Sequence, residues 1–272
     1  MAKTDPPTSP PDSLTLLIGA PRSGTTLIGN AFMSHSTVCG IHEPYQRVRK
    51  DGYETTNLAA FQNDYDLDFA KTPNLAMKET TTRLRNVELS LGLAQNAQQN
   101  GIYTGLVLIL RCPFEAFLSQ VEASREHWEE KKLTEITEDN VAHFFTRQRA
   151  AIRLICENAR RFHFRIASYD RFCAAPETEI ARLMALIPVS LEPHQKALMP
   201  DETIVGAADP KFASSHGGVK KTDRATAVEQ LIETYQHLPS VKFAVAQRAL
   251  IALNPKKMTD IEKLDALTAL AL

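Results

Sequence analysis

The stretch LTLLIGAPRSGTTLIGNAF, residues 14–32, constrains the fold more than any other part of this chain. Its first residues, 14–18, form a short apolar run that is typical of a fully buried strand. A loop bounded by Gly19 and Gly24 follows, and the next residues have helical spacing with apolar side chains on one face. A strand, a glycine-bounded loop and a helix N-terminus in this order form a phosphate cradle, because backbone N–H groups and the positive end of the helix dipole point into the loop.

The spacing of this loop is close to that of the nucleotide-binding P-loop, G-x-x-x-x-G-K-[ST]. Gly19, Gly24 and Thr26 match the pattern, but Thr25 stands where the lysine should be. The loop carries its positive charge at Arg22 instead. In NTPases the lysine reaches the β- and γ-phosphates and the following hydroxyl holds Mg²⁺. The loop is therefore poorly suited to triphosphate hydrolysis, but it suits one 5′-phosphate with a second anionic group attached.

Short apolar strands alternate with helical patterns along the rest of the chain. Further strands are predicted at 75–78, 106–110 and 164–168. Further helices are predicted to begin near residues 79, 113, 138, 176, 224, 240 and 259. This alternation predicts an α/β fold of the P-loop type, with three α/β/α layers, a mostly parallel central sheet and a helical C-terminal segment.

The domain organisation is expected to be simple. Residues 14–272 are predicted to form one domain, of which 224–272 are the helical C-terminal part. Residues 1–13, MAKTDPPTSPPDS, are rich in proline and contain no apolar core. We expect them to be a disordered lead-in and not a signal peptide.

Three local expectations concern the segments between these elements. Residues 34–40 are interpreted as a polar turn. Pro44 is expected to keep Glu43 extended and to discourage a helix, because proline disfavours the helical conformation in the residue before it. The oxygens of residues 79–81 are expected to cap a helix that runs to about residue 98.

Composition limits the kinds of partner. The chain has 272 residues and a formal net charge of −1, so no overall field favours nucleic acid, and an anion site must be local. The four cysteines are far apart with no C-x-x-C spacing, which argues against a zinc site and favours reduced thiols in the cytoplasm. No apolar run approaches the ~18 residues of a membrane span.

A second signal follows the most apolar predicted strand, LVLIL at 106–110. Arg111 comes directly after it and should emerge at the carboxyl edge of the sheet, where open α/β sheets bind ligands. Ser119 lies eight residues further on, two turns into the next predicted helix. An arginine fork and a hydroxyl placed in this way can hold one phosphate from two sides.

At this point the chain resembles the sulfotransferases that use 3′-phosphoadenosine 5′-phosphosulfate (PAPS). GAPRSGTT at 19–26 is similar to their 5′-phosphosulfate loop, and RCP at 111–113 with Ser119 is similar to their Arg-Asp-Pro…Ser motif for the 3′-phosphate. Cys112 replaces the usual aspartate, and we expect this to be tolerated because Arg111 and Ser119 match the binding residues. SYDRF at 168–172 resembles the family's Tyr-Glu-Asp-Leu segment.

The resemblance implies PAPS as the cofactor, adenosine 3′,5′-bisphosphate as the product and no requirement for a metal. A looser similarity links DPKF at 209–212 and the following GGVKK to the late loop that closes over the nucleotide. The cofactor-binding residues implied are Arg22, Ser23, Gly24, Thr25, Thr26, Arg111, Ser119, Tyr169, Gly217, Gly218 and Lys220.

Sulfuryl transfer also needs a base for the acceptor proton and positive charge near the leaving oxygen. Glu43 is our choice for the base, because the bacterial small-molecule and tyrosylprotein branches of the family use a glutamate soon after the first helix. We expect it at the mouth of the cleft. Lys78 matches a lysine that the family uses at the leaving group or transferring sulfuryl, and Arg22 supplies further charge. His42 and His216 are rival bases.

Two other functions stay open from the sequence. A P-loop kinase or NTPase would need an aspartate for Mg²⁺, a role that Asp170 could fill. A nucleotide-binding protein that has lost catalysis would keep the loop alone.

The acceptor has no motif of its own. It is expected to be a small molecule or saccharide with a hydroxyl, bound by residues within 44–74, 125–140 and 200–222. The expected setting is the cytoplasm of a bacterium, with no nucleic acid or membrane span involved and with oligomerisation open.

Overall fold

The computed structural model describes residues 9–48, 53–126, 133–187, 189–193, 195, 224–253 and 258–272. Several residues considered in the sequence analysis lie outside these ranges, namely 209–212, His216 and 217–221, which include Gly217, Gly218 and Lys220. Their predicted roles stay predictions.

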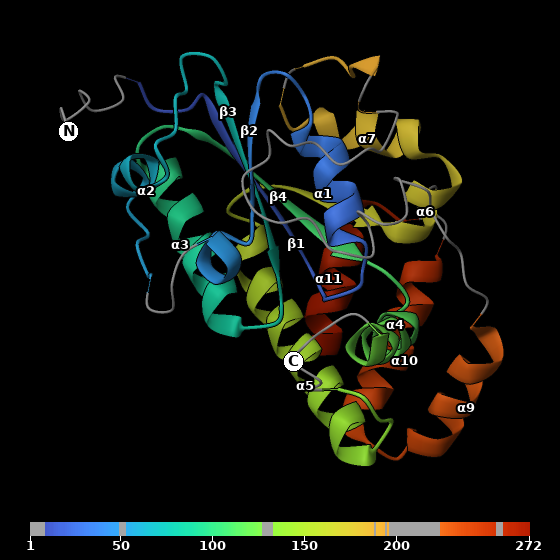
Figure 1. Cartoon of the computed structure of the whole chain (residues 1–272). Helices are drawn as coiled ribbons and strands as arrows, with labels where there is room; N and C mark the ends of the chain where they lie inside the picture. The colour runs from blue at the N-terminus through green and yellow to red at the C-terminus, as the bar shows by residue number, and fades with distance from the viewer. Residues whose placement is uncertain are drawn as a thin grey trace.

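A five-stranded parallel sheet forms the centre of the described fold, in the order β2-β3-β1-β4-β5 (Figure 1). The strands are β1 (Ser13–Gly19), β2 (Val38–His42), β3 (Asn74–Thr80), β4 (Tyr103–Leu110) and β5 (His163–Ser168). Every residue of β1 is buried, because this strand has a neighbour on each side and helices on both faces. The predicted α/β fold with a parallel sheet is confirmed.

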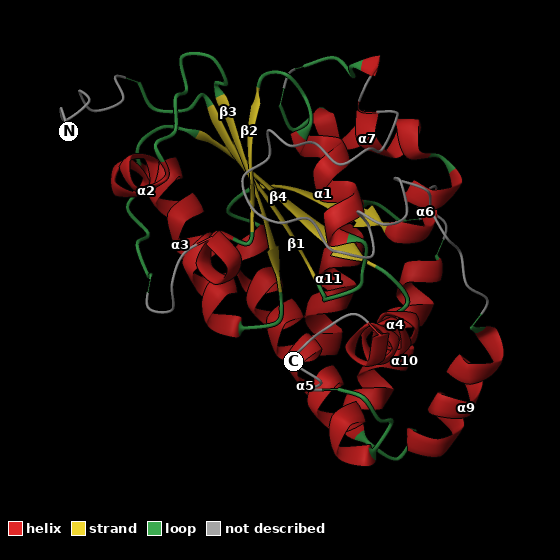
Figure 2. Cartoon of the chain, viewed as in Figure 1, coloured by secondary structure: helices red, strands yellow, loops and turns green. Residues whose placement is uncertain are grey.

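Helices cover both faces of the sheet (Figure 2). They are α1 (Thr25–Met33), α2 (Leu58–Tyr65), α3 (Leu84–Gln99), α4 (Pro113–Glu126), α5 (Glu138–Ala159), α6 (Tyr169–Ala174), α7 (Pro176–Met184), α9 (Ala225–Tyr235), α10 (Pro239–Ala252) and α11 (Asp260–Ala271). Alternate strand residues face opposite layers. Leu17 and Val107 pack with α1, α6 and α7 in one apolar cluster. Leu16 and Leu108 pack with α3, α5 and α11 in another.

A third apolar cluster joins α4 and α5 to the C-terminal helices α9 and α10. Phe145 of α5 lies 5.1 Å from Phe114 and 5.7 Å from Phe117 of α4, measured between ring centroids. Val228 and Val241 pack against this cluster from α9 and α10. The predicted helical C-terminal segment is therefore confirmed over its described residues, and it supports the helix that follows Arg111.

The prediction that residues 79–81 cap a helix is wrong. Glu79 and Thr80 are the last residues of β3, and they pair with Ile18 and Gly19 of β1. The helix α3 begins at Leu84 instead, after Arg83. Pairing with the central strand outweighs the capping preference of threonine, because the strand buries its side chains on both faces of the sheet.

The expectations for residues 34–44 also need correction. Val38 already pairs with Asn74 of β3, so the polar turn is shorter than predicted. Glu43 has a φ of 47°, in the left-handed region, and Pro44 begins a π-helical turn, η1 (Pro44–Val48). Proline is tolerated in the first turn of a helix, where its missing N–H would have no partner.

The expected lead-in ends earlier than residue 13. Ser13 is the first residue of β1, and its Oγ donates a hydrogen bond to Asn74 Oδ1 at 2.7 Å. The Asp12 N–H donates to the Pro73 carbonyl at 2.7 Å. Over the described part of the chain, no helix has the length and apolar character needed to cross a membrane.

The strand order indicates where a ligand could bind, namely at the carboxyl edge of the sheet between β1 and β4. The connection after β1 leads through α1 towards β2, whereas the connection after β4 leads through α4 and α5 to β5 at the opposite edge. The loops after β1 and β4 therefore diverge at the carboxyl edge of two paired strands. Open α/β sheets bind ligands at such a switch point.

Candidate active site

The loop between β1 and α1 is held in a tight turn by its own groups. Ser23 donates from its Oγ to the Ala20 carbonyl at 2.7 Å and from its N–H to the same oxygen at 3.1 Å. Gly19 packs so closely that an added Cβ would lie 2.8 Å from the Ile109 carbonyl of β4 and 2.7 Å from Ser23 Oγ. A side chain at position 19 would therefore push the loop away from β4.

Gly24 ends this loop with a φ of 87° and precedes α1. The structure shows no side-chain cap on α1 among the described residues, and the first turn contains no acidic residue. The N–H groups of the first turn have no carbonyl partner within a helix, and they carry the positive end of its dipole. The predicted residues Ser23, Gly24, Thr25 and Thr26 thus lie where an anion can bind to backbone amides.

Arg22 joins the two predicted phosphate motifs. Its Nε donates to Ser119 Oγ at 3.4 Å, and its carbonyl accepts from Arg111 Nη1 at 3.0 Å, across 97 and 89 residues of sequence. Arg22 has a φ of 65°. A non-glycine residue in this region costs about 1–3 kcal/mol, and such strain is concentrated at functional sites. The fold therefore brings Arg22, Arg111 and Ser119 together.

Arg111 is largely buried, with 10% of its side chain exposed. Its Nε and Nη2 donate to Glu115 Oε2 at 3.3 and 3.0 Å. Its guanidinium also lies over the ring of Tyr169, 4.4 Å from the centroid. Sequence reasoning missed Glu115, although its position four residues after Arg111 was a usable signal.

Tyr169, the first residue of α6, lies against the phosphate loop. A Cβ added to Gly24 would be 2.3 Å from Tyr169 Cδ2. Burial raises the pKa of Tyr169 to about 12, and the positive charge of Arg111 acts in the opposite direction. The phenol therefore keeps its proton at neutral pH and can donate a hydrogen bond. This position fits the predicted role of Tyr169 beside the cofactor.

Glu43, directly after β2, and Lys78, within β3, form a buried ion pair. Lys78 Nζ lies 2.5 Å from Glu43 Oε1, and the two side chains are 1% and 2% exposed. The Glu43 N–H also donates to the Lys78 carbonyl at 2.7 Å. The stem of Lys78 runs across α1 at Gly29, where an added Cβ would lie 3.2 Å from Lys78 Cγ. Glu43 is thus enclosed and not at an open mouth as expected.

The rival base His42 is also enclosed. It is 2% exposed, and its Nε2 lies 2.6 Å from Asn30 Oδ1 of α1. His42 pairs in register with Lys78, so it belongs to the same end of the sheet as Glu43.

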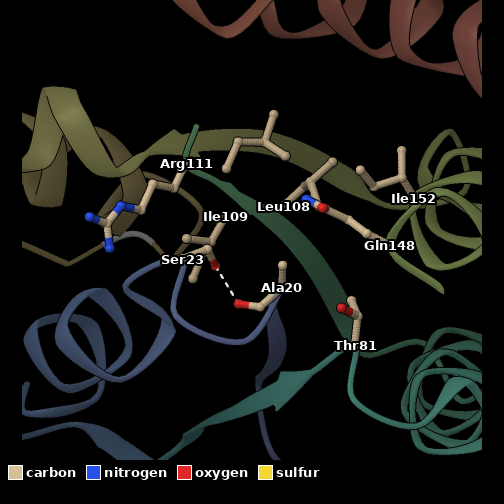
Figure 3. Close-up of a pocket in the computed structure, with 9 residues that line it drawn as sticks. Ala20, Ser23, Thr81, Leu108, Ile109, Arg111, Gln148 and Ile152 are labelled. Atoms are coloured by element: carbon tan, nitrogen blue, oxygen red, sulfur yellow. Dashed lines mark hydrogen bonds between the residues drawn. The ribbon is translucent and has the colours of Figure 1, made fainter. Parts of the chain in front are cut away.

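A small pocket lies beside the phosphate loop, between β4, α5 and the chain after β3 (Figure 3). It includes Ala20, Ser23, Thr81, Leu110, Arg111 and Gln148 among its lining residues. Gln148 of α5 is 5% exposed, and no donor in the described part of the chain reaches its Oε1. Figure 3 shows its side chain directed into the pocket, whereas the Arg111 guanidinium points away from Gln148. The pocket has room for only about one water molecule, so Gln148 Oε1 is a buried polar atom in the wall beside the phosphate loop.

Sequence reasoning did not find Gln148. It is one polar position on the buried face of a long helix, and only the position of the helix against the loop shows its environment. Among the described residues, no three histidine, cysteine, aspartate or glutamate side chains gather as metal ligands would.

Comparison with solved structures identifies the fold. The sulfotransferase domain from the curacin biosynthetic pathway matches with a TM-score of 0.53 and 13% identity, covering 89% of this chain and 99% of that domain. The sulfotransferase domain of the Synechococcus PCC 7002 olefin synthase gives 0.49 and 13%, covering 87% and 98%. Mouse sulfotransferase SULT7A1, complexed with PAP, gives 0.45 and 11%, covering 83% and 85%.

The chain therefore has the fold of a sulfotransferase domain, as the curacin-pathway match shows. No protein-family model matches the sequence, and no curated protein matches it.

The contact between Gly24 and Tyr169 leads to a stability prediction. Gly24→Ala should destabilise the protein more than Gly101→Ala, as measured by urea unfolding. Both glycines have positive φ, 87° and 78°, which costs a residue with a side chain about 1–2 kcal/mol. Only Gly24 has a neighbour in the way, because an added Cβ at Gly101 meets nothing within 4 Å.

In a protein that already carries Tyr169→Ala, Gly24→Ala should lower the free energy of unfolding only by about as much as Gly101→Ala does. Equal losses from the two glycine substitutions would show that Tyr169 does not constrain the loop.

Proposed function

We propose that this protein is a sulfotransferase, which moves the sulfuryl group of PAPS to a hydroxyl of an acceptor and releases adenosine 3′,5′-bisphosphate. The observation that carries the proposal is the meeting of Arg22, Arg111 and Ser119 beside the N-terminus of α1, which no side chain caps among the described residues. Two motifs that were assigned to the two ends of one nucleotide are thus adjacent at the carboxyl edge of the sheet. The shared fold supports the same class of reaction.

The residues present fit such a donor. The amides of residues 23–26 would bind its 5′-phosphosulfate, with Arg22 beside them. Arg111 and Ser119 would bind its 3′-phosphate, because an arginine fork and a hydroxyl donor suit phosphate oxygens. Ser119 Oγ accepts from Arg22 Nε, and a hydroxyl can donate its own proton at the same time, so Ser119 could also bond to a phosphate oxygen. Tyr169 would lie next to this nucleotide, and Gly217, Gly218 and Lys220 would close over it.

When bound, the donor supplies the sulfuryl group, and the chain supplies the base and the positive charge. We assign the base to Glu43, which would take the proton of the acceptor hydroxyl. Lys78 orients Glu43 through their 2.5 Å contact, and it would also place positive charge near the leaving oxygen. Because both side chains are almost fully buried, little water would compete for that proton.

The acceptor is proposed to be a small molecule or saccharide with a hydroxyl. We keep the bacterial cytoplasm as the proposed setting, where the four free cysteines would stay reduced.

The donor assignment is tested by ligand-dependent stability. Adenosine 3′,5′-bisphosphate should raise the free energy of unfolding without Mg²⁺, by about 2.7 kcal/mol at a hundred times its Kd. Thermal unfolding with and without EDTA measures this. Stabilisation by ATP with Mg²⁺, and none by the bisphosphate, would favour the kinase alternative. Labelled-sulfate transfer from PAPS to a panel of hydroxyl acceptors then separates an enzyme from a protein that only binds nucleotide.

Arg111→Ala should weaken binding of adenosine 3′,5′-bisphosphate by about 1.5–3 kcal/mol, because it removes a charge-assisted phosphate contact. Adenosine 5′-monophosphate, which lacks the 3′-phosphate, should lose less affinity, because it is affected only through the bond of Arg111 to the Arg22 carbonyl. Arg153→Ala is the matched control, since Arg153 lies on the exposed side of α5 in a similar pair with Glu157. Calorimetry measures all six affinities. Equal weakening for both nucleotides would remove Arg111 from the 3′-phosphate site.

Glu43→Gln should lower turnover by roughly 10²–10⁴-fold while leaving affinity for the bisphosphate nearly intact, because it removes a base and no phosphate contact. It also removes the carboxylate charge opposite a buried lysine, so a stability loss of about 3–5 kcal/mol is expected. Retained nucleotide binding shows that the assayed protein is folded.

Glu79→Gln is the control, because Glu79 of β3 is also a buried carboxylate but has no assigned role in the reaction. Turnover at the wild-type level in Glu43→Gln would move the assignment of the base to His42 or His216.

A further inference from the structure

Arg111 lies two residues before α4, and Glu115 and Ser119 follow it on α4 at intervals of four residues. Side chains at this spacing on a helix lie on one face and can touch. The carboxylate of Glu115 therefore belongs to the same stripe as the two groups assigned to the 3′-phosphate. Arg111 donates to Glu115 Oε2 from Nε and Nη2, and Ser119 Oγ accepts a hydrogen bond from Arg22 Nε.

The guanidinium of Arg111 is thus already in use. Its Nε and Nη2, which together form one of the two edges that can hold a carboxylate or phosphate, both donate to Glu115 Oε2. Nη1 is directed to the Arg22 carbonyl. The Glu115 oxygen accordingly lies in one of the two positions in which Arg111 could hold a phosphate oxygen.

We propose that Glu115 is an internal counter-anion, which occupies the 3′-phosphate subsite until the nucleotide displaces it. This inference rests on the proposed function and deepens it, because it names a residue that sets the affinity of the donor and product. Glu115 is 28% exposed, so its carboxylate can turn into water at low cost. Arg111 is only 10% exposed, so it needs an anion beside it when no nucleotide is bound.

The exchange favours a particular kind of ligand. A 3′-phosphate carries more negative charge than a carboxylate, and it is anchored by the 5′ end of the same nucleotide in the phosphate loop. A monophosphate bound only at the loop has no group to displace Glu115. Glu115 should therefore weaken the binding of adenosine 3′,5′-bisphosphate, which helps the product to leave, and should leave adenosine 5′-monophosphate unaffected.

The test compares these two nucleotides by calorimetry on the wild-type protein, Glu115→Gln and Glu157→Gln. Glu157 is the matched control, because it follows Arg153 by four residues in an exposed pair on α5, with a distance of 2.8 Å. Glu115→Gln should bind the bisphosphate about 3- to 10-fold more tightly, with the monophosphate changed by less than about 2-fold. Glu157→Gln should change neither affinity.

Unchanged or weaker bisphosphate binding in Glu115→Gln would overturn the inference, since a residue that only orients Arg111 would weaken binding when it is lost. The proposed function would survive that result if the wild-type protein binds the bisphosphate.

A second experiment uses inorganic phosphate to test the role of Glu115 independently of the assignment of PAPS as the donor. It should raise the melting temperature of Glu115→Gln more than that of the wild-type protein, and Arg111→Ala in the same chain should cancel the difference. If the bisphosphate binds to neither protein but this phosphate effect is seen, the donor assignment fails and the role of Glu115 stands. No difference with phosphate would overturn the role of Glu115.

Discussion

The hydrogen bond from Arg111 to the Arg22 carbonyl is the contact on which the candidate site depends. It exists because β1 and β4 are paired in parallel along their whole shared length, with Leu17 opposite Val107, so that their carboxyl ends reach the same edge together. The absence of a side chain at Gly19 lets the loop lie directly on the β4 backbone. Sheet register, more than any local motif, therefore decides which two loops face one nucleotide.

Much of this arrangement was predictable from the sequence, and the reasons are local. An apolar run that ends in a glycine-bounded loop indicates a strand end, and Arg111 directly after five apolar residues indicates another. Parallel strands then bring both ends to one edge. Glu115 was missed although its spacing from Arg111 was a usable signal. Gln148 could not be found in this way, because its role depends on how α5 packs beside the phosphate loop. The extension of β3 to Thr80 was missed because pairing with β1 overrides local preference.

Two of the three non-glycine residues with positive φ in the described part of the chain belong to the candidate site. The non-glycine residues with positive φ in the described part of the chain are Arg22, Glu43 and Asp66. The first two are a predicted anion-binding residue and the predicted base, one after β1 and the other after β2. Surrounding contacts hold them there, since Arg22 is tied to Arg111 and Glu43 to Lys78. Backbone strain of this kind is concentrated at binding and active sites, where the direction of a side chain is part of its function.

The passage of the Lys78 stem over Gly29 links two positions that are far apart in sequence. A glycine inside a helix lowers helix stability by about 1 kcal/mol relative to alanine, so α1 carries a cost that the lysine explains. Related chains that keep a long side chain on β3 at this point should keep glycine opposite it, whereas those with a short one are free to use alanine. Covariation between these two positions in an alignment would thus trace which relatives retain the lysine.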